Sequence, residues 1–184
     1  MNPVIIYKGK YGATGQYAKW LGEEFKLAVA DTETIGGDDL NLFDTLIIGS
    51  SVYIGKLQIK KWLKDNQRFL TNKKIFFFQV AATPPQQKEK RQVYNEAGIP
   101  KDLLGNCNFY FLHGRLNFKK LSWLDKLLLR AGAFMVKDPM EKKGMLTDYD
   151  NVIKENLNEM IGDLKKYFAL NGKKISSSEK EVVV

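Results

Sequence analysis

The residues with the clearest chemical potential lie near the amino terminus, between an apolar run at residues 3–7 and a helical periodicity that starts at Thr14. The segment consists of Lys8, Gly9, Lys10, Tyr11, Gly12, Ala13 and Thr14. Backbone amides at the start of a helix, glycines that let the backbone approach a ligand, and the Thr14 hydroxyl favour the binding of an anion such as phosphate. The glycine spacing matches neither the dinucleotide nor the P-loop signature. An ordinary strand-to-helix turn with solvated lysines is the alternative interpretation.

Two further loops carry residue types that suit a flat, polar ligand. The first comprises Ser50, Ser51, Val52, Tyr53, Ile54 and Gly55, and the second comprises Ala81, Ala82 and Thr83. Tyr53 offers an aromatic face for stacking, and the small residues of the second loop leave room for a planar group. The alternatives are an exposed loop aromatic at Tyr53 and a plain strand end at residues 81–83.

Several other chemistries are disfavoured. The only histidine, His113, has no nucleophile motif beside it, so hydrolysis by a catalytic triad is not expected. No group of histidines and cysteines has metal-ligand spacing, so we expect no metal site. The single cysteine, Cys107, cannot form an internal disulfide, and residues 1–4 carry no basic leader segment. We therefore expect a reducing, cytoplasmic location.

The three loops need a scaffold that brings them together. Five apolar, strand-like runs alternate with helical patterns, at residues 3–7, 27–30, 45–48, 74–79 and 108–112. This alternation predicts an α/β fold with an open five-stranded parallel sheet and helices on both faces. The loops would then meet beyond the carboxyl ends of the strands.

The chain of 184 residues is expected to form one domain over residues 1–172, followed by a flexible tail at 173–184. Apolar spacing predicts a helix at about 57–70. It also predicts a long final helix from Tyr149 to Phe168, closed by Gly172.

A helical insertion at about residues 115–147 interrupts the alternation after the fifth strand. Residues 115–143 hold eight basic and three acidic side chains, so they supply +5 of the net charge of +8. Charges within the apolar stretch 119–136 exclude a membrane-spanning helix. The candidate contacts for an anionic substrate, a quinone or an anionic membrane surface are Arg115, Lys119, Lys120 and Trp123. Nucleic acid is disfavoured because no recognised binding motif accompanies the charge.

At this point the chain resembles a known family. The strand order together with the segments 7–14 and 47–55 is similar to flavodoxin-like FMN proteins. More narrowly, the segments 114–118, 123–126 and 144–148 resemble the menaquinone-dependent, oxygen-independent protoporphyrinogen oxidase branch.

The resemblance implies that the FMN phosphate binds at residues 8–14 and that the isoalloxazine lies between the loops after the third and fourth strands. Lys8 and Gly9 occupy the early positions of a loop that is usually rich in hydroxyls, which leaves Thr14 as the evident hydroxyl ligand. Charge from Lys8 or Lys10 could compensate for the missing hydroxyls. Backbone donors at residues 50–55 would stabilise the reduced ring, and Tyr53 would shield it.

These observations predict an FMN-dependent oxidoreductase, protoporphyrinogen oxidase-like, which passes electrons from an organic substrate to a quinone-type acceptor. It would work in the cytoplasm, with the insertion as a peripheral contact to the inner face of the membrane. One alternative is a non-enzymatic FMN electron carrier, although the basic charge is opposite to that of an acidic electron shuttle. A second alternative is a flavin-free interaction module that has kept the fold and lost the site. Neither a catalytic residue nor an oligomeric state is assigned.

Overall fold

A parallel sheet forms the centre of the computed structural model, which describes residues 1–83, 85–137 and 139–178. Its strands are β1 (Pro3–Lys8), β2 (Val29–Asp31), β3 (Thr45–Tyr53), β5 (Lys74–Ala81) and β6 (Cys107–His113), in the order β2-β1-β3-β5-β6. All four neighbouring pairs are parallel. The predicted five-stranded α/β sheet is confirmed, and a short β4 (Lys56–Leu57) adds an antiparallel pairing at the end of β3.

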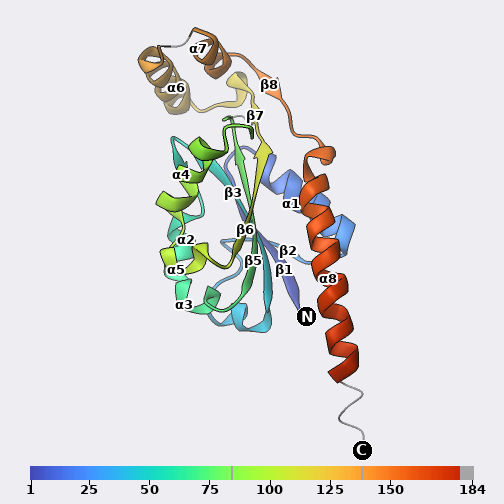
Figure 1. The fold of residues 1–184 in the computed structure, drawn as a ribbon. Coiled ribbons are helices and arrows are strands. Elements are labelled where there is room, and N and C mark those ends of the chain that lie inside the picture. Colours follow the sequence, from blue (N-terminus) through green and yellow to red (C-terminus); the bar gives the residue numbers. More distant parts are fainter. Residues whose placement is uncertain (84, 138, 179–184) are drawn as a thin grey trace, which may run out of the picture.

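Helices cover both faces of this sheet (Figure 1). On one face lie α1 (Ala13–Phe25) and α8 (Asn158–Ser178), and on the other lie α2 (Lys60–Asp65), α3 (Gln67–Leu70), α4 (Lys88–Gly98) and α5 (Lys101–Leu104). Alternate strand residues supply two separate cores, because successive side chains of a strand point to opposite faces. In β5, Phe76 and Phe78 pack toward α1 and α8, whereas Phe77 packs toward α2 and α5. Burial on both faces explains the continuous apolar runs in β1, β3 and β5.

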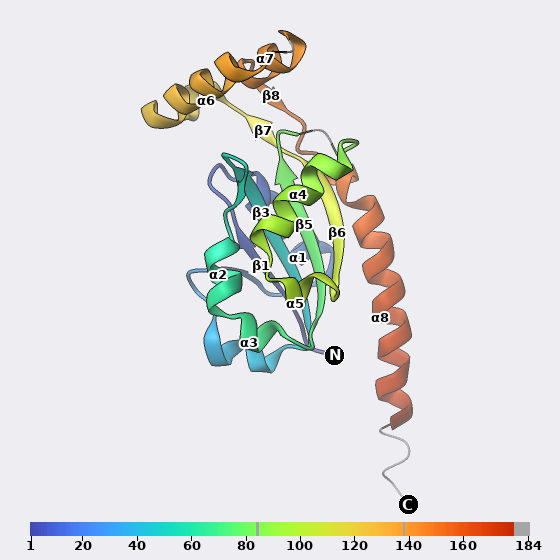
Figure 2. The same cartoon turned by 60° about the vertical axis from the view of Figure 1, so that its left-hand side comes forward.

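The insertion lies beyond the carboxyl ends of the strands, as Figures 1 and 2 show. It consists of β7 (Arg115–Leu116), the 3-10 helix η2 (Phe118–Lys120), α6 (Trp123–Met135), α7 (Pro139–Leu146) and β8 (Tyr149–Asp150). Strands β7 and β8 pair antiparallel and return the chain to the domain. The side chain of Ser122 caps α6 by accepting a hydrogen bond of 3.2 Å from the Asp125 amide. The predicted helical insertion after the fifth strand is confirmed.

The final helix starts later than its apolar spacing predicts. Tyr149 belongs to β8, where it pairs with Leu116, and a 3-10 helix η3 (Lys154–Leu157) precedes α8. The prediction of a helix from Tyr149 was therefore wrong for its first two turns, because the apolar residues there belong to a hairpin and pack against the core instead. Helix α8 also passes Gly172 and continues to Ser178, so it enters the segment predicted as a tail, of which residues 179–184 lie outside the described part.

The helix predicted at 57–70 is divided in two at Asn66. The Asn66 side chain accepts a hydrogen bond of 2.6 Å from the Gly37 amide and donates one of 2.9 Å to the Trp62 carbonyl. These bonds tie the break to the 3-10 helix η1 (Gly37–Leu42), which lies after β2 in the chain.

Candidate functional site

The candidate site lies where the direction of strand order reverses. From β1 the chain proceeds to β2 on one side, whereas β3 lies on the other side, and Lys8 at the end of β1 is in register with Ser50 of β3. In open α/β sheets a ligand crevice forms outside the carboxyl ends at such a point. The first predicted loop and the end of β3 meet here.

Two buried hydroxyls with no hydrogen-bond partner among the described residues lie at this point. Thr14 is 1% exposed, and neither its Oγ1 nor the buried Oγ of Ser51 has a partner among the described residues. Gly9 lies beside both, since a Cβ added there would lie 2.7 Å from the Thr14 Oγ1 and 3.7 Å from the Ser51 Oγ. Buried hydroxyls are nearly always paired, so two unpaired ones at one glycine indicate a place for an acceptor group.

The start of α1 adds backbone donors to these hydroxyls. Gly12 precedes the helix in the left-handed conformation, with φ of 82°, and no side chain caps the first turn. Its first amides are therefore without a capping side chain, at the positive end of the helix macrodipole. Glycines, free amides and a hydroxyl are the donor set predicted from the sequence for an anion, and the structure brings them together.

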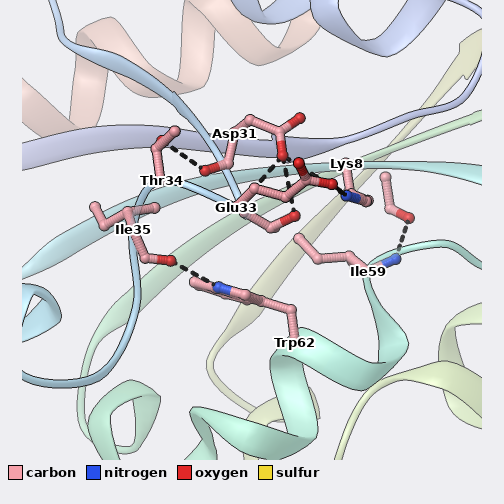
Figure 3. Close-up of polar contacts among 9 residues, drawn as sticks. Lys8, Asp31, Glu33, Thr34, Ile35, Ile59 and Trp62 are labelled. Atoms are coloured by element: carbon pink, nitrogen blue, oxygen red, sulfur yellow. Dashed lines mark hydrogen bonds and ion pairs between the residues drawn. The ribbon is translucent and has the colours of Figure 1, made fainter.

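The other predicted serine has a structural contact. Ser50 is fully buried, donates a hydrogen bond of 3.0 Å to the Ser51 carbonyl and accepts one of 3.3 Å from the Ile59 amide. Figure 3 shows the hydrogen bond that the amide of the labelled Ile59 donates. Of the two hydroxyls, only Ser51 remains available to a ligand.

The segment 50–55 is a hairpin rather than an open loop. Val52 pairs with Leu57 and Tyr53 with Lys56, so Ile54 and Gly55 form a two-residue turn with φ of 47° and 68°. Two consecutive positive φ angles are typical of the tight turns that suit strand twist. The hairpin fixes Tyr53, which is half-buried, beside the first loop.

The two lysines of the first loop are already paired. The Lys8 Nζ lies 2.6 Å from the Glu33 carboxylate and 3.7 Å from the Asp31 carboxylate, toward the β2 edge (Figure 3). The hydrogen bond to Glu33 raises the pKa of Lys8. The Lys10 Nζ lies 2.8 Å from the Asp125 carboxylate and 4.1 Å from the centre of the Tyr53 ring. Neither ammonium group is directed at the unpaired hydroxyls, so charge compensation by Lys8 or Lys10 stays a hypothesis.

Asp125 of α6 is a site residue that the sequence did not single out. Its side chain is 4% exposed, and it accepts hydrogen bonds from Lys10 and from the hydroxyls of Tyr11 and Tyr53. Its hydrogen bond with Lys10 raises the pKa of that lysine. The one available signal was chemical: Asp125 is the sole carboxylate of the apolar and basic stretch 119–136.

The loop after β5 meets the end of β6. Ala81 is buried, Ala82 is exposed, and Thr83 is half-buried. The Gly114 amide donates a hydrogen bond of 2.9 Å to the Ala81 carbonyl, and a Cβ at Gly114 would lie 3.1 Å from that oxygen. The small residues predicted for a planar group thus lie at the same edge of the sheet as the first loop.

A cleft of about 400 Å³ adjoins the first loop on the side of the insertion. Tyr11, Arg115, Lys120, Tyr149 and Asp150 are among the residues that line it. One Nη of Arg115 lies 3.4 Å from the Asp150 carboxylate. The buried Nε of Arg115 has no hydrogen-bond partner among the described residues. The predicted contacts Arg115 and Lys120 therefore share this cleft.

The other two predicted contacts, Lys119 and Trp123, are exposed, and Trp123 keeps 73% of its side-chain area open to solvent. Neither residue lines the cleft beside the first loop.

Arg91 has a position that the sequence did not indicate. Polar neighbours suggested a surface segment, but Arg91 of α4 is fully buried and donates hydrogen bonds to the Gln79 side chain, the Gln79 carbonyl and the Leu112 carbonyl, at 2.8, 2.6 and 2.9 Å. Burial lowers its pKa to about 10. Burial and this neighbouring cation also lower the pKa of His113.

The described part of the chain has neither a group of side chains suited to a metal ion nor a helix suited to span a membrane. There, no three histidine, cysteine, aspartate or glutamate side chains are grouped so as to hold a metal ion. No helix of this part is both long enough and apolar enough to cross a bilayer.

A known protein family matches most of the chain. Residues 4–143 match the flavodoxin domain. The chain belongs to the flavodoxin family. An uncharacterized protein of Methanocaldococcus jannaschii is 29% identical over 135 residues, which cover 68% of this chain and 86% of the relative.

Solved structures of flavodoxins are also similar. A flavodoxin from the domain Archaea is 16% identical, with a TM-score of 0.44, over 70% of this chain and 90% of that protein. The two-electron-reduced flavodoxin of Megasphaera elsdenii is 16% identical, with a TM-score of 0.47, over 60% of this chain and 85% of that protein.

Membership of the flavodoxin family indicates a flavin cofactor, and the site fits the phosphate of FMN. The unpaired hydroxyls of Thr14 and Ser51 and the amides after Gly12 provide neutral donors for a phosphate group, and Gly9 has no side chain that would crowd Thr14. A group with several acceptor oxygens would satisfy both hydroxyls at once.

Proposed function

We propose that the protein is an FMN-dependent oxidoreductase that oxidises an anionic organic substrate and reduces a quinone-type acceptor. One observation carries the proposal: two buried hydroxyls without partners lie beside one glycine, at the switch point of a flavodoxin-type sheet. Bound FMN supplies the electron and hydride transfer.

Each part of the site has a separate role in this proposal. Thr14, Ser51 and the first amides of α1 hold the phosphate, and Gly9 carries no side chain that would crowd the Thr14 hydroxyl. Tyr53, fixed by its hairpin, shields the ring. These groups bind and orient the cofactor, and the proposal assigns no proton transfer to them.

The cleft beside the first loop supports an anionic substrate. Arg115 and Lys120 lie there together with Asp148 and Asp150, and Arg115 can exchange its partner Asp150 for a substrate carboxylate, which a guanidinium binds in a bidentate manner. A substrate that carries carboxylates on an apolar ring system, such as a porphyrinogen, suits a cleft that also contains Tyr11 and Tyr149. This is also the substrate class of the protoporphyrinogen oxidase-like branch that the sequence resembles.

The exposed side of α6 supports an acceptor dissolved in a membrane. Trp123, Phe134 and Met135 are 73%, 84% and 83% exposed, and the exposed Lys119 and Arg130 belong to the same stretch of the chain. Apolar groups with basic neighbours favour the surface of an anionic bilayer, where a quinone is available. Co-sedimentation with vesicles that contain anionic lipid, but not with neutral vesicles, would support this contact.

The decisive test is whether the purified chain binds added FMN. Binding is measured by the quenching of flavin fluorescence. A matched pair of variants locates the site. A Cβ at Gly9 would meet the Thr14 Oγ1 at 2.7 Å, whereas a Cβ at Gly105 meets nothing within 4 Å. We expect Gly9→Ala to abolish saturable binding and Gly105→Ala to bind as the unmodified chain does. Absence of FMN binding by the unmodified chain would refute the proposal.

Steady-state turnover then separates an enzyme from an electron carrier. The holoprotein is mixed with a porphyrinogen and a menaquinone analogue, and the formation of porphyrin is followed by its absorbance. Bound flavin without turnover would assign the chain to the electron carriers.

A further inference from the structure

The buried carboxylate of Asp125 holds helix α6 against the rest of the domain. Of its residues only Asp125 and Ala133 are buried, whereas most of its large apolar side chains, including Trp123, Leu127 and Phe134, face solvent. Apolar packing therefore contributes little to the position of this helix. The polar contacts of Asp125 must supply much of what holds it against the sheet edge.

The partners of Asp125 come from both segments that form the proposed FMN site. Lys10 and Tyr11 belong to the first loop, and Tyr53 belongs to the end of β3. The Lys10 Nζ lies 2.8 and 3.1 Å from the two carboxylate oxygens, and each of the two tyrosine hydroxyls donates to one of these oxygens. A buried carboxylate is costly unless it is paired and hydrogen-bonded, and here an ammonium group and two phenols satisfy it.

This arrangement places an anion of the protein itself beside the position proposed for an anionic cofactor. While Asp125 is bound, Lys10 and Tyr53 are engaged with a carboxylate and are not available to a flavin. The closed ion pair carries no net charge, whereas release of Asp125 leaves the Lys10 ammonium free to attract the phosphate dianion of FMN. The donors serve one anion or the other, which makes the contact a two-state element.

We propose that Asp125 is a latch: it closes α6 over the cofactor site, and it must release Lys10, Tyr11 and Tyr53 before FMN enters or leaves. This inference rests on the proposed function. The latch couples cofactor exchange to the position of the insertion, because the open state alone binds FMN at full affinity.

The test compares Asp125→Asn with Asp65→Asn. The first variant removes the charge of the latch and keeps its shape, and the Ser122 cap is retained because it accepts from the Asp125 backbone amide. The control removes a carboxylate of a surface ion pair with Lys61 on α2, which makes the same change in net charge. Association of FMN is followed by stopped-flow fluorescence, and exposure of α6 by hydrogen exchange of the amides at residues 123–135.

We expect Asp125→Asn to bind FMN on the order of tenfold faster and to exchange the α6 amides faster, while Asp65→Asn changes neither rate. Unchanged association of FMN in Asp125→Asn would overturn the latch and leave the proposed function standing. If neither the unmodified chain nor the variant binds FMN, the proposed function fails. In that case hydrogen exchange still tests whether Asp125 holds α6 in place: faster exchange of the α6 amides in Asp125→Asn supports this contact, and unchanged exchange overturns it.

Discussion

Replacement of Thr14 by valine separates what the hydroxyl does for the fold from what it does for the cofactor. The side chain is 1% exposed and its Oγ1 has no partner among the described residues. A buried hydroxyl left unpaired costs about 1–3 kcal/mol, and valine has nearly the same shape without that cost. We therefore expect Thr14→Val to raise the free energy of unfolding of the cofactor-free protein by about 1 kcal/mol, at the low end of that range.

The same change should weaken the binding of FMN. A hydrogen bond from the hydroxyl to a charged phosphate oxygen contributes about 1.5–3 kcal/mol. Because 1.4 kcal/mol corresponds to a factor of ten, the dissociation constant should rise about 10- to 150-fold. Ser51→Ala removes the second unpaired hydroxyl, and we expect it to act in the same direction.

Two measurements on each variant test this reasoning. Urea unfolding of the cofactor-free protein, followed by circular dichroism, gives the change in stability, and fluorescence titration gives the FMN affinity. Thr71→Val is the control, since the Thr71 hydroxyl already donates to the Gln67 carbonyl at 3.0 Å and lies far along the chain from both loops. A Thr14→Val variant that loses 1 kcal/mol or more of stability but binds FMN normally would show that the hydroxyl has a structural partner instead.

Three further predictions concern buried groups near the sheet. Arg91→Ala removes three hydrogen bonds to buried acceptors on Gln79 and Leu112, so we expect a loss of about 3–5 kcal/mol in the free energy of unfolding, measured with urea. Burial and Arg91 lower the pKa of His113 below its unfolded value, so protonation favours the unfolded chain. Stability should fall as the pH decreases from about 7 through the folded-state pKa of His113, and His113→Gln should lessen this fall between pH 7.5 and pH 5. Burial raises the pKa of Cys107 to about 12, so iodoacetamide should alkylate it slowly at pH 8 in the native protein and rapidly in urea, as mass spectrometry would report.

The sheet could be predicted because its determinants are local. Strand β5 is apolar at every position from Ile75 to Phe78, and such a run is typical of a strand that is covered by helices on both faces. In the structure β5 pairs with two neighbouring strands. The rule that loops gather at the carboxyl ends then located the site. The start of α8 could not be predicted in this way, since Tyr149 and Val152 have helical spacing but are held by a hairpin and by the core.

The site could be predicted only in part, and the part that failed depends on long-range contacts. Thr14 and Ser51 were predicted from residue type: Thr14 as a hydroxyl beside glycines at the start of a helix, and Ser51 as one of two hydroxyls in the loop after the third strand. Asp125 was missed since its partners Lys10 and Tyr11 are more than 110 residues away in the chain. Arg91 was missed because its neighbours in the chain are polar, whereas its burial arises from Gln79 and Leu112 on two strands.

The unpaired hydroxyls also weigh against a flavin-free interaction module. A domain that needed only the fold would be more stable with valine at position 14 and alanine at position 51, because neither hydroxyl is used by the described structure. The neighbouring Ser50 makes the contrast, since its hydroxyl both donates and accepts within the protein and has a structural role without any ligand. Of these two adjacent serines, only Ser51 has a hydroxyl without a hydrogen-bond partner among the described residues. The hydroxyl without a partner, that of Ser51, lies near Gly9 and Thr14, where a phosphate would supply the acceptor that the chain does not.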